Sequence, residues 1–196
     1  MPRPRGISDD EILMATARVM ARVPPGAFTL ALVGTEAGIS PATLLQRFGS
    51  KLGLMKALAD AGVSGMPDAL VEVRARHESP VQGIEAYLQG FALLAPNADV
   101  LINNLAYLQQ DLSEPTLREP TRALFVAHEE ALHSLLTDAV AAGELRKIDT
   151  HALARTLLAV TQGVLILWAF HRSGTARSAI AKEVRAILAP HQSSEE

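Results

Sequence analysis

Apolar residues recur along most of the chain with the three-to-four-residue spacing of an amphipathic helix. In the first such stretch this period runs from Leu13 to Met20 and ends at VPPG (23–26), because proline cannot continue a helix. Ser8 precedes Glu11 by three residues, which is the spacing of a capping box. The pattern therefore predicts a first helix that begins just after Ser8.

Two short helices are predicted to follow at close spacing. Thr29 can cap one that ends at Gly38, a residue suited to a left-handed turn. Ser40 and Pro41 then provide the N-cap and first position of a helix that reaches about Phe48. Two short helices joined by a tight turn are typical of the helix-turn-helix of DNA-reading proteins.

The rest of the chain also has a helical pattern. Two glycines and a proline in GVSGMP (62–67) interrupt the fourth helix, so we expect domains at 1–62 and 63–196. Ala and Leu are abundant and strand-forming residues few, which favours an all-α protein of about nine to ten helices. Its N-terminal domain would be a three-helix helix-turn-helix unit, followed by a larger helical domain. Beyond the boundary we predict helices at 68–77, 80–95, 97–111, 116–142, 149–172 and 175–189.

Composition excludes several classes of site. The chain contains no cysteine, so it has no disulfides, thiolate zinc sites or cysteine nucleophiles. The start MPRPRG lacks the apolar core of a secretory signal, and the apolar stretch GVLILWAF (163–170) is shorter than a membrane span. We expect a cytoplasmic protein with no membrane partner.

Charge is unevenly distributed along the chain. The net charge is −3, yet residues 1–60 hold seven Lys or Arg against five Asp or Glu. An excess of positive charge at one end is a mild indication of a polyanionic partner there.

The predicted DNA-contacting face lies opposite Leu44 and Phe48, the apolar pair of the third helix, at about 100° per residue. It consists of Ala42, Thr43 and Gln46, with Leu45 and Arg47 on its flanks. In a major groove Gln46 can pair with adenine, Arg47 with guanine or a phosphate, and a methyl group with thymine. The alternative is a helical hairpin whose polar face is merely solvated.

Phosphate contacts are expected at helix starts. Lys51 and the backbone N–H groups at the start of the fourth helix suit an anion, and Thr29 offers a second site. Arg3 and Arg5 precede the first helix and are either solvated or in contact with the minor groove or phosphates.

The segment FTLALVGTEAGISPATLLQRFGSKLGLMKAL (28–58) resembles the DNA-binding region of the TetR family of transcription regulators. The matching positions are Phe28, Thr29, Val33, Ala37, Gly38, Ile39, Ser40, Thr43, Leu44, Phe48, Ser50 and Lys51. The resemblance implies that Thr29, Thr43 and Lys51 contact phosphates and that the third helix enters the major groove of a double-stranded operator. Leu45 stands where the family usually has tyrosine. Gly34 replaces the usual alanine, at roughly 0.5–1 kcal/mol of helix propensity.

The helix at 149–172 is apolar nearly all round, so its extra face needs either more core or a partner subunit. The segment 141–170 is similar to the family's stretch ahead of its dimer helices. We therefore expect a homodimer in which this helix and the one at 175–189 form a four-helix bundle with their copies in the partner subunit. Such a dimer would present two helix-turn-helix domains to a palindromic operator. The interface residues expected are Leu158, Leu165 and Trp168.

The resemblance also implies a small-molecule pocket in the C-terminal domain, with the regulator acting as a repressor that its effector releases. Polar or amphipathic residues among apolar neighbours are the candidate contacts, although each can equally be a satisfied internal group. They are Tyr87, Asn103, Asn104, Tyr107, His128 and Gln162, with Phe91, Phe125 and Trp168 as walls. The composition of this set favours a mostly apolar effector.

No enzyme signature is present, and no cofactor is expected. The sequence lacks a phosphate-binding loop, a nucleophile elbow and a paired-carboxylate arrangement. The segment HEEALH (128–133) is similar to a zinc-protease signature. Its histidines, His128 and His133, are five residues apart and so lie on different faces of a helix, whereas the two zinc ligands of that signature are four apart. The alternative function is a helical small-molecule carrier or protein-interaction domain that no longer binds DNA.

Overall fold

The computed structural model describes residues 7–193, and within that range the chain is all-α, as predicted. No strand occurs among these residues, apart from an isolated bridge that pairs Leu145 with Gln192. The helices are α1 (Asp9–Arg22), α2 (Leu30–Ala37), α3 (Pro41–Phe48), α4 (Lys51–Ser64), α5 (Met66–Arg76), α6 (Pro80–Gln89), α7 (Ala98–Ser113), α8 (Pro115–Ala141), α9 (Thr150–His171) and α10 (Ala176–Leu188), with 3₁₀ turns η1 (Gly90–Leu94) and η2 (Ala189–His191).

Side-chain caps set the starts of the first helices. Ser8 Oγ accepts from the Glu11 N–H at 3.1 Å, and the Glu11 carboxylate accepts from the Ser8 N–H at 2.7 Å, which confirms the capping box. Ser40 caps α3 ahead of Pro41. Gly38 has φ +70°, the left-handed conformation that lets α2 end one turn before α3 begins.

Two helix boundaries differ from the predicted ones. Helix α4 continues through Gly62 to Ser64. A Cβ at Gly62 would lie 2.9 Å from the Leu124 side chain, so glycine allows the close approach of Leu124 at this point. The stretch predicted as one helix at 80–95 is α6 followed by η1. The Gly90 N–H there points at three successive carbonyls, which tightens the last turn.

The chain forms two compact units. The described part of the first unit is 7–64 together with 102–124, and that of the second is 65–101 together with 125–193. The boundary predicted at 62 lies close to the end of α4. The segment 102–124, which the pattern assigned to the C-terminal domain, joins the first unit because Tyr107 and Leu117 are buried in its core.

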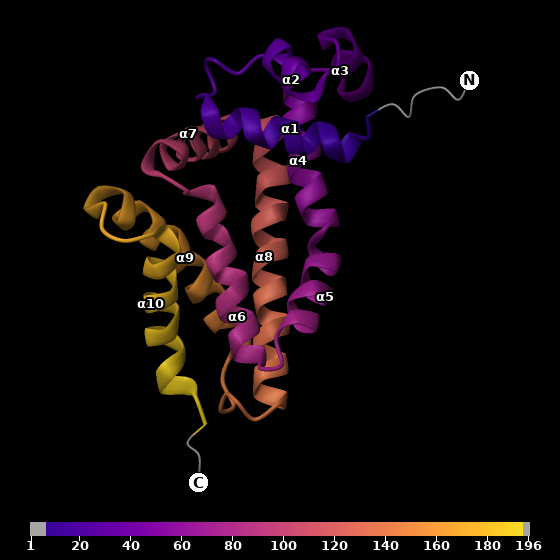
Figure 1. Ribbon diagram of the computed structural model, residues 1–196. Helices are drawn as coiled ribbons and strands as arrows, with labels where there is room; N and C mark the ends of the chain where they lie inside the picture. Colours follow the sequence, from indigo (N-terminus) through magenta and orange to yellow (C-terminus); the bar gives the residue numbers. More distant parts are fainter. Residues whose placement is uncertain (1–6, 194–196) are drawn as a thin grey trace. The chain divides into compact units, whose positions relative to one another are not determined.

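In the first unit α1 packs against α2 and α4, and α3 packs between α2 and α4 (Figure 1). Their shared core contains Ile12, Val19, Phe28, Val33, Leu44, Leu54 and Met55. Leu44 is fully buried, as its position on the third helix predicts. This packing leaves the opposite side of α3 at the surface.

In the second unit α10 lies along α9 and α6, and α5 packs against α6. Their apolar contacts bury Leu157 and Leu165 of α9 with Ile180 and Val184 of α10. By length and composition α9 could cross a membrane, since the stretch 163–170 continues a longer apolar helix. A core or interface helix passes the same test.

Candidate functional site

The exposed side of α3 is the candidate DNA-reading face. Ala42, Leu45 and Gln46 are exposed, while Thr43 is half-buried and its hydroxyl lies 2.9 Å from that of Ser40. Leu45 leaves 47% of its surface exposed although it is apolar. The face is therefore short, and neutral apart from Arg47.

Thr29 caps α2 at the edge of this arrangement. Its Oγ1 accepts from the Leu32 N–H at 3.2 Å, and the residue remains exposed. The hydroxyl proton stays available for a further acceptor because the cap uses only a lone pair. A phosphate bound at this helix start would accept hydrogen bonds from the Thr29 hydroxyl and from backbone N–H groups.

Lys51 holds the loop between α1 and α2. Its ammonium donates to the carbonyls of Pro25 at 2.9 Å and Phe28 at 3.0 Å, and it lies 5.1 Å from the centre of the Phe28 ring. Ser50 caps α4 instead, by accepting from the Gly53 N–H at 2.9 Å. In the free protein the Lys51 charge thus stabilises the turn that precedes α2.

Arg47 also turns back onto its own unit. Its guanidinium donates to the Ile7 carbonyl at 2.8 Å and pairs with the Asp9 carboxylate at 2.6 Å. Helical spacing predicts Arg47 beside the candidate reading face. Its partners in the structure lie near the start of α1 and are distant in sequence. Arg3 and Arg5 lie outside the described residues.

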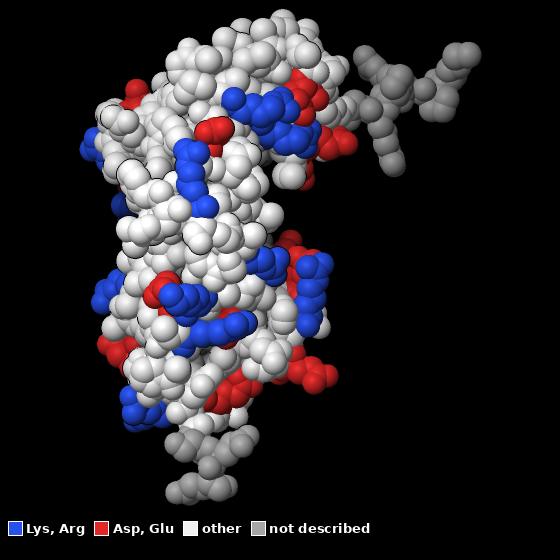
Figure 2. Space-filling view, turned by 60° about the vertical axis from the view of Figure 1, so that its left-hand side comes forward, with Lys and Arg blue, Asp and Glu red and all other residues white. Residues whose placement is uncertain are grey.

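Opposite charges are interspersed on the surface. On the face drawn in Figure 2, Lys and Arg side chains form separate groups beside Asp and Glu, with no continuous basic surface. In the first unit Glu36 accepts from both Arg18 and Arg22, and Lys56 pairs with Asp60. The excess of positive charge predicted from residues 1–60 is therefore largely compensated locally.

Three candidate effector contacts, Asn103, Asn104 and Tyr107, lie in the first unit. Asn103 donates to the Ala21 carbonyl at 3.0 Å, and the Tyr107 hydroxyl donates to the Val23 carbonyl at 2.9 Å. The Tyr107 ring meets that of Phe28 edge-on, and burial raises the pKa of its hydroxyl to about 12. Both side chains tie α7 to the end of α1, and Asn104 is half-buried beside them in sequence.

Three other candidates come together in the second unit. The Tyr87 hydroxyl lies 2.6 Å from His128 Nδ1 and 3.2 Å from the Met66 sulfur. The Phe91 ring packs 4.9 Å from the His128 ring. Burial raises the pKa of Tyr87 and lowers the pKa of His128, so both are neutral near pH 7. We call Met66, Tyr87, Phe91 and His128 the Tyr87 cluster.

The remaining candidates occupy separate positions. Phe125 and Gln162 are half-buried, and the Trp168 indole donates to the Gly174 carbonyl at 3.2 Å. His133 stacks on His151 with ring centres 3.5 Å apart and lies 2.9 Å from the Thr150 hydroxyl. The two histidines of the 128–133 motif therefore have different partners.

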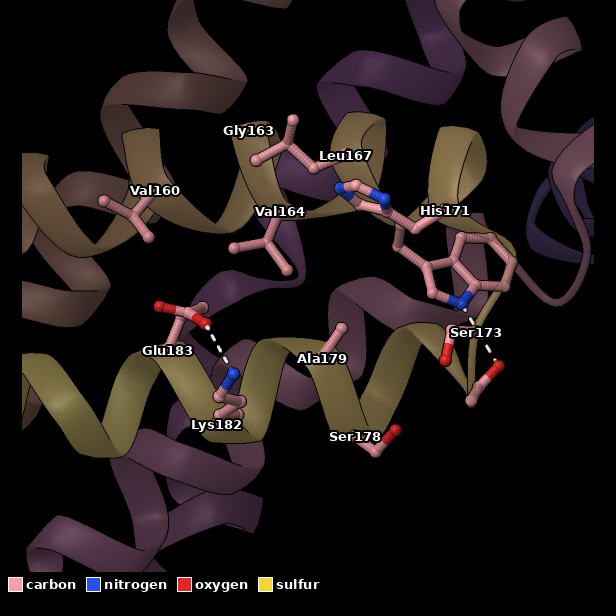
Figure 3. Close-up of a pocket in the computed structure, with 12 residues that line it drawn as sticks. Val160, Gly163, Val164, Leu167, His171, Ser173, Ser178, Ala179, Lys182 and Glu183 are labelled. Carbon is pink, nitrogen blue, oxygen red and sulfur yellow. Dashed lines mark hydrogen bonds and ion pairs between the residues drawn. The ribbon is translucent and has the colours of Figure 1, made fainter.

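A groove of about 870 Å³ runs between α9 and α10 (Figure 3). On α9 it is lined by Val160, Gly163, Val164, Leu167, Trp168 and His171, and on the other side by Ser173, Gly174, Ser178, Ala179, Lys182 and Glu183. Most of this lining is apolar, with the Lys182 and Glu183 pair at one end. We call it the α9–α10 groove.

The exposed apolar face of α9 differs from the one predicted. Leu158 and Leu165 are buried in the chain's own core. The exposed positions are instead Ile166, Leu167 and, with 83% of its surface accessible, Phe170. Sequence pattern missed these because a helix apolar all round does not show which of its faces the chain itself covers.

Residues 12–58 match the family model described as "Bacterial regulatory proteins, tetR family". A TetR-family regulator from Rhodococcus sp. is similar over 91% of this chain and 97% of its own, at 23% identity and TM-score 0.71. A regulator from Saccharomonospora viridis, solved in complex with choline, is 17% identical, with coverages of 95% and 98% and TM-score 0.74. FadR from Bacillus subtilis, solved with stearoyl-CoA, is 16% identical, with coverages of 92% and 97% and TM-score 0.71. A search of curated protein sequences found no match.

Proposed function

We propose that this chain, whose residues 12–58 match the tetR family model, is a DNA-binding transcription regulator. It is a cytoplasmic repressor that a small apolar effector releases. The observation that carries the DNA-binding role is the exposed face of α3, held outward by the burial of Leu44. Gln46 is the base reader on this face. Thr29, Thr43 and the start of α4 contact phosphates.

We propose that two copies associate through the α9–α10 groove. One short reading helix supplies few base contacts, so useful sequence specificity requires the reading helices of two copies on a palindromic operator. The support for this surface is Phe170 and Leu167, which leave 83% and 58% of their surface exposed beside the groove. A second copy would cover both and form a four-helix bundle.

We propose that the effector binds at the Tyr87 cluster. The cluster combines aromatic and thioether surfaces with two neutral polar groups, a composition that suits a small apolar molecule carrying one hydrogen-bonding group. An effector that releases DNA must bind the DNA-incompetent state more tightly, by about 1.4 kcal/mol for each tenfold loss of operator affinity.

The test of the DNA-binding role is to sequence the genomic fragments that the purified protein retains and to measure Gln46→Ala on the preferred site. We expect a loss of about 1–3 kcal/mol on that site and little change on random duplexes. Gln82→Ala, an exposed glutamine on α6, is the matched control. Equal losses on both DNAs would remove Gln46 as a reader.

The effector proposal is tested by thermal shift against a hydrophobic library, followed by gel shifts with each compound that raises the melting temperature. Tyr87→Phe keeps the ring and removes the hydroxyl, so we expect it to weaken the response while operator binding without the compound is retained. Stabilising compounds that leave operator binding unchanged would contradict this site.

A folded dimer that retains no DNA fragment would instead favour the alternative function, a helical small-molecule carrier or protein-interaction domain.

A further inference from the structure

We propose that Asp9 competes with DNA phosphate for Arg47, and thereby lowers the affinity of this protein for DNA of every sequence. The inference rests on the DNA-binding function proposed above. Its basis is the pair in which Arg47, next to the reader Gln46 on α3, meets the Asp9 carboxylate at 2.6 Å. The same guanidinium donates to the Ile7 carbonyl at 2.8 Å, so its position is defined by two contacts.

The position of the pair distinguishes it from the other ion pairs of the first unit. Every Lys and Arg side chain in the described part of that unit contacts a carboxylate or a backbone carbonyl, and Arg47 is the one on α3. When α3 enters a major groove, its C-terminal flank approaches the sugar-phosphate backbone. Arg47 is therefore the cation whose present partner a phosphate would replace.

The exchange is feasible because the pair is accessible. The Asp9 side chain is 61% exposed and that of Arg47 is 30% exposed. Ion pairs with such exposure contribute little to stability and are readily exchanged for another anion. Asp9 nevertheless opposes binding in two ways, because it occupies the guanidinium and leaves a negative charge beside the phosphate that displaces it.

The consequence concerns overall affinity and not sequence preference. Affinity for random DNA comes almost entirely from phosphate contacts, so an internal competitor for one such contact weakens binding to the many wrong sites. Base contacts made by Gln46 are unaffected. The protein thus keeps its preference for the operator while it binds all DNA, the operator included, less tightly.

The experiment measures dissociation constants for a random duplex and for the preferred duplex over a range of KCl concentrations. We expect Asp9→Asn to tighten binding to both duplexes about three- to tenfold at low salt. It should also steepen the logarithmic salt dependence by about one unit, since the Arg47 charge at the phosphate is then no longer offset by the neighbouring carboxylate. Asp10→Asn is the matched control, because it removes the same charge from the next residue of α1 while the Arg47 pair stays in place.

Arg47→Gln completes the test. In that background we expect Asp9→Asn to have no larger effect than Asp10→Asn, because Arg47, the cation that Asp9→Asn would free from its ion pair, is absent. Equal effects of the two asparagine variants in the parent, or an undiminished Asp9→Asn effect without Arg47, would overturn the competitor role and leave the regulator function intact. A folded parent that binds no duplex at any salt would overturn both proposals.

Discussion

Gly34 shows how one residue can matter in a way that helix propensity does not reveal. Propensity alone predicts that the usual alanine would stabilise α2. A Cβ at this position, however, would lie 2.6 Å from the Ile39 carbonyl oxygen, which is a backbone atom that cannot move independently. Glycine lets the chain pass closely over α2 as it enters α3.

We therefore expect Gly34→Ala to destabilise the protein. Overpacking costs about 1–3 kcal/mol, which exceeds the roughly 0.5–1 kcal/mol that alanine returns in helix propensity. Urea denaturation measures the difference. Ala31→Gly, at an exposed position of the same helix, calibrates propensity alone and should lose about 1 kcal/mol. A gain in stability for Gly34→Ala would mean that the turn relaxes without cost.

Lys51 is expected to contribute to folding as well as to DNA binding. Because its ammonium donates to two carbonyls, Lys51→Met should lower the free energy of unfolding by about 1–3 kcal/mol. Lys56→Met removes an exposed pair with Asp60 and should cost about 0.5 kcal/mol or less. Similar losses for the two variants would show that the loop does not depend on Lys51.

At this scale the sequence predicts positions on helices better than side-chain directions. Caps such as Ser8 and Thr29 act within three residues, and so their roles follow from local spacing. Arg47 and Lys51 have partners 40 and 26 residues away in sequence, which no local pattern encodes. Their DNA-contacting roles remain predictions.

At the scale of elements, the Tyr87 cluster joins α5, α6 and α8 through half-buried polar groups. Sequence pattern placed Tyr87, Phe91 and His128 in one candidate pocket, and in the structure these three side chains contact one another. Their contact with an effector stays a prediction. The same pattern grouped them with Asn103 and Tyr107, which belong to the other unit. Periodicity indicates which residues face inward but not which core they enter.

The cluster predicts a pH dependence of stability. Burial lowers the pKa of His128, so the folded state favours the neutral imidazole. This contribution is fully present above the ordinary histidine pKa and is lost as the pH falls through the lowered value. We expect the free energy of unfolding to decrease from about pH 7 to pH 5, and His128→Gln to reduce that decrease. An unchanged pH profile in the variant would assign the effect to other groups.

At the scale of the whole molecule, assembly provides the sharpest test. Phe170→Glu places a charge on an exposed apolar site, so we expect a folded monomer in sedimentation at micromolar concentration and a large loss of operator affinity. Phe170→Leu, which keeps the site apolar, should remain dimeric. Leu165→Glu should instead unfold the chain, because Leu165 is buried within it. A dimeric Phe170→Glu variant would place the interface elsewhere.

The first unit is discontinuous in sequence, and this has a consequence for how the chain is made. Tyr107 and Leu117 belong to its core, yet they are separated from α4 by the start of the second unit. A nascent chain that has emerged only as far as Ser64 has its reading helix but lacks part of the core against which α1 and α4 pack. The core of the first unit is complete only when α7 and the beginning of α8 have left the ribosome. A chain terminated before α7 lacks Tyr107 and Leu117, so we expect its DNA-binding helices to be less stable than those of the full chain.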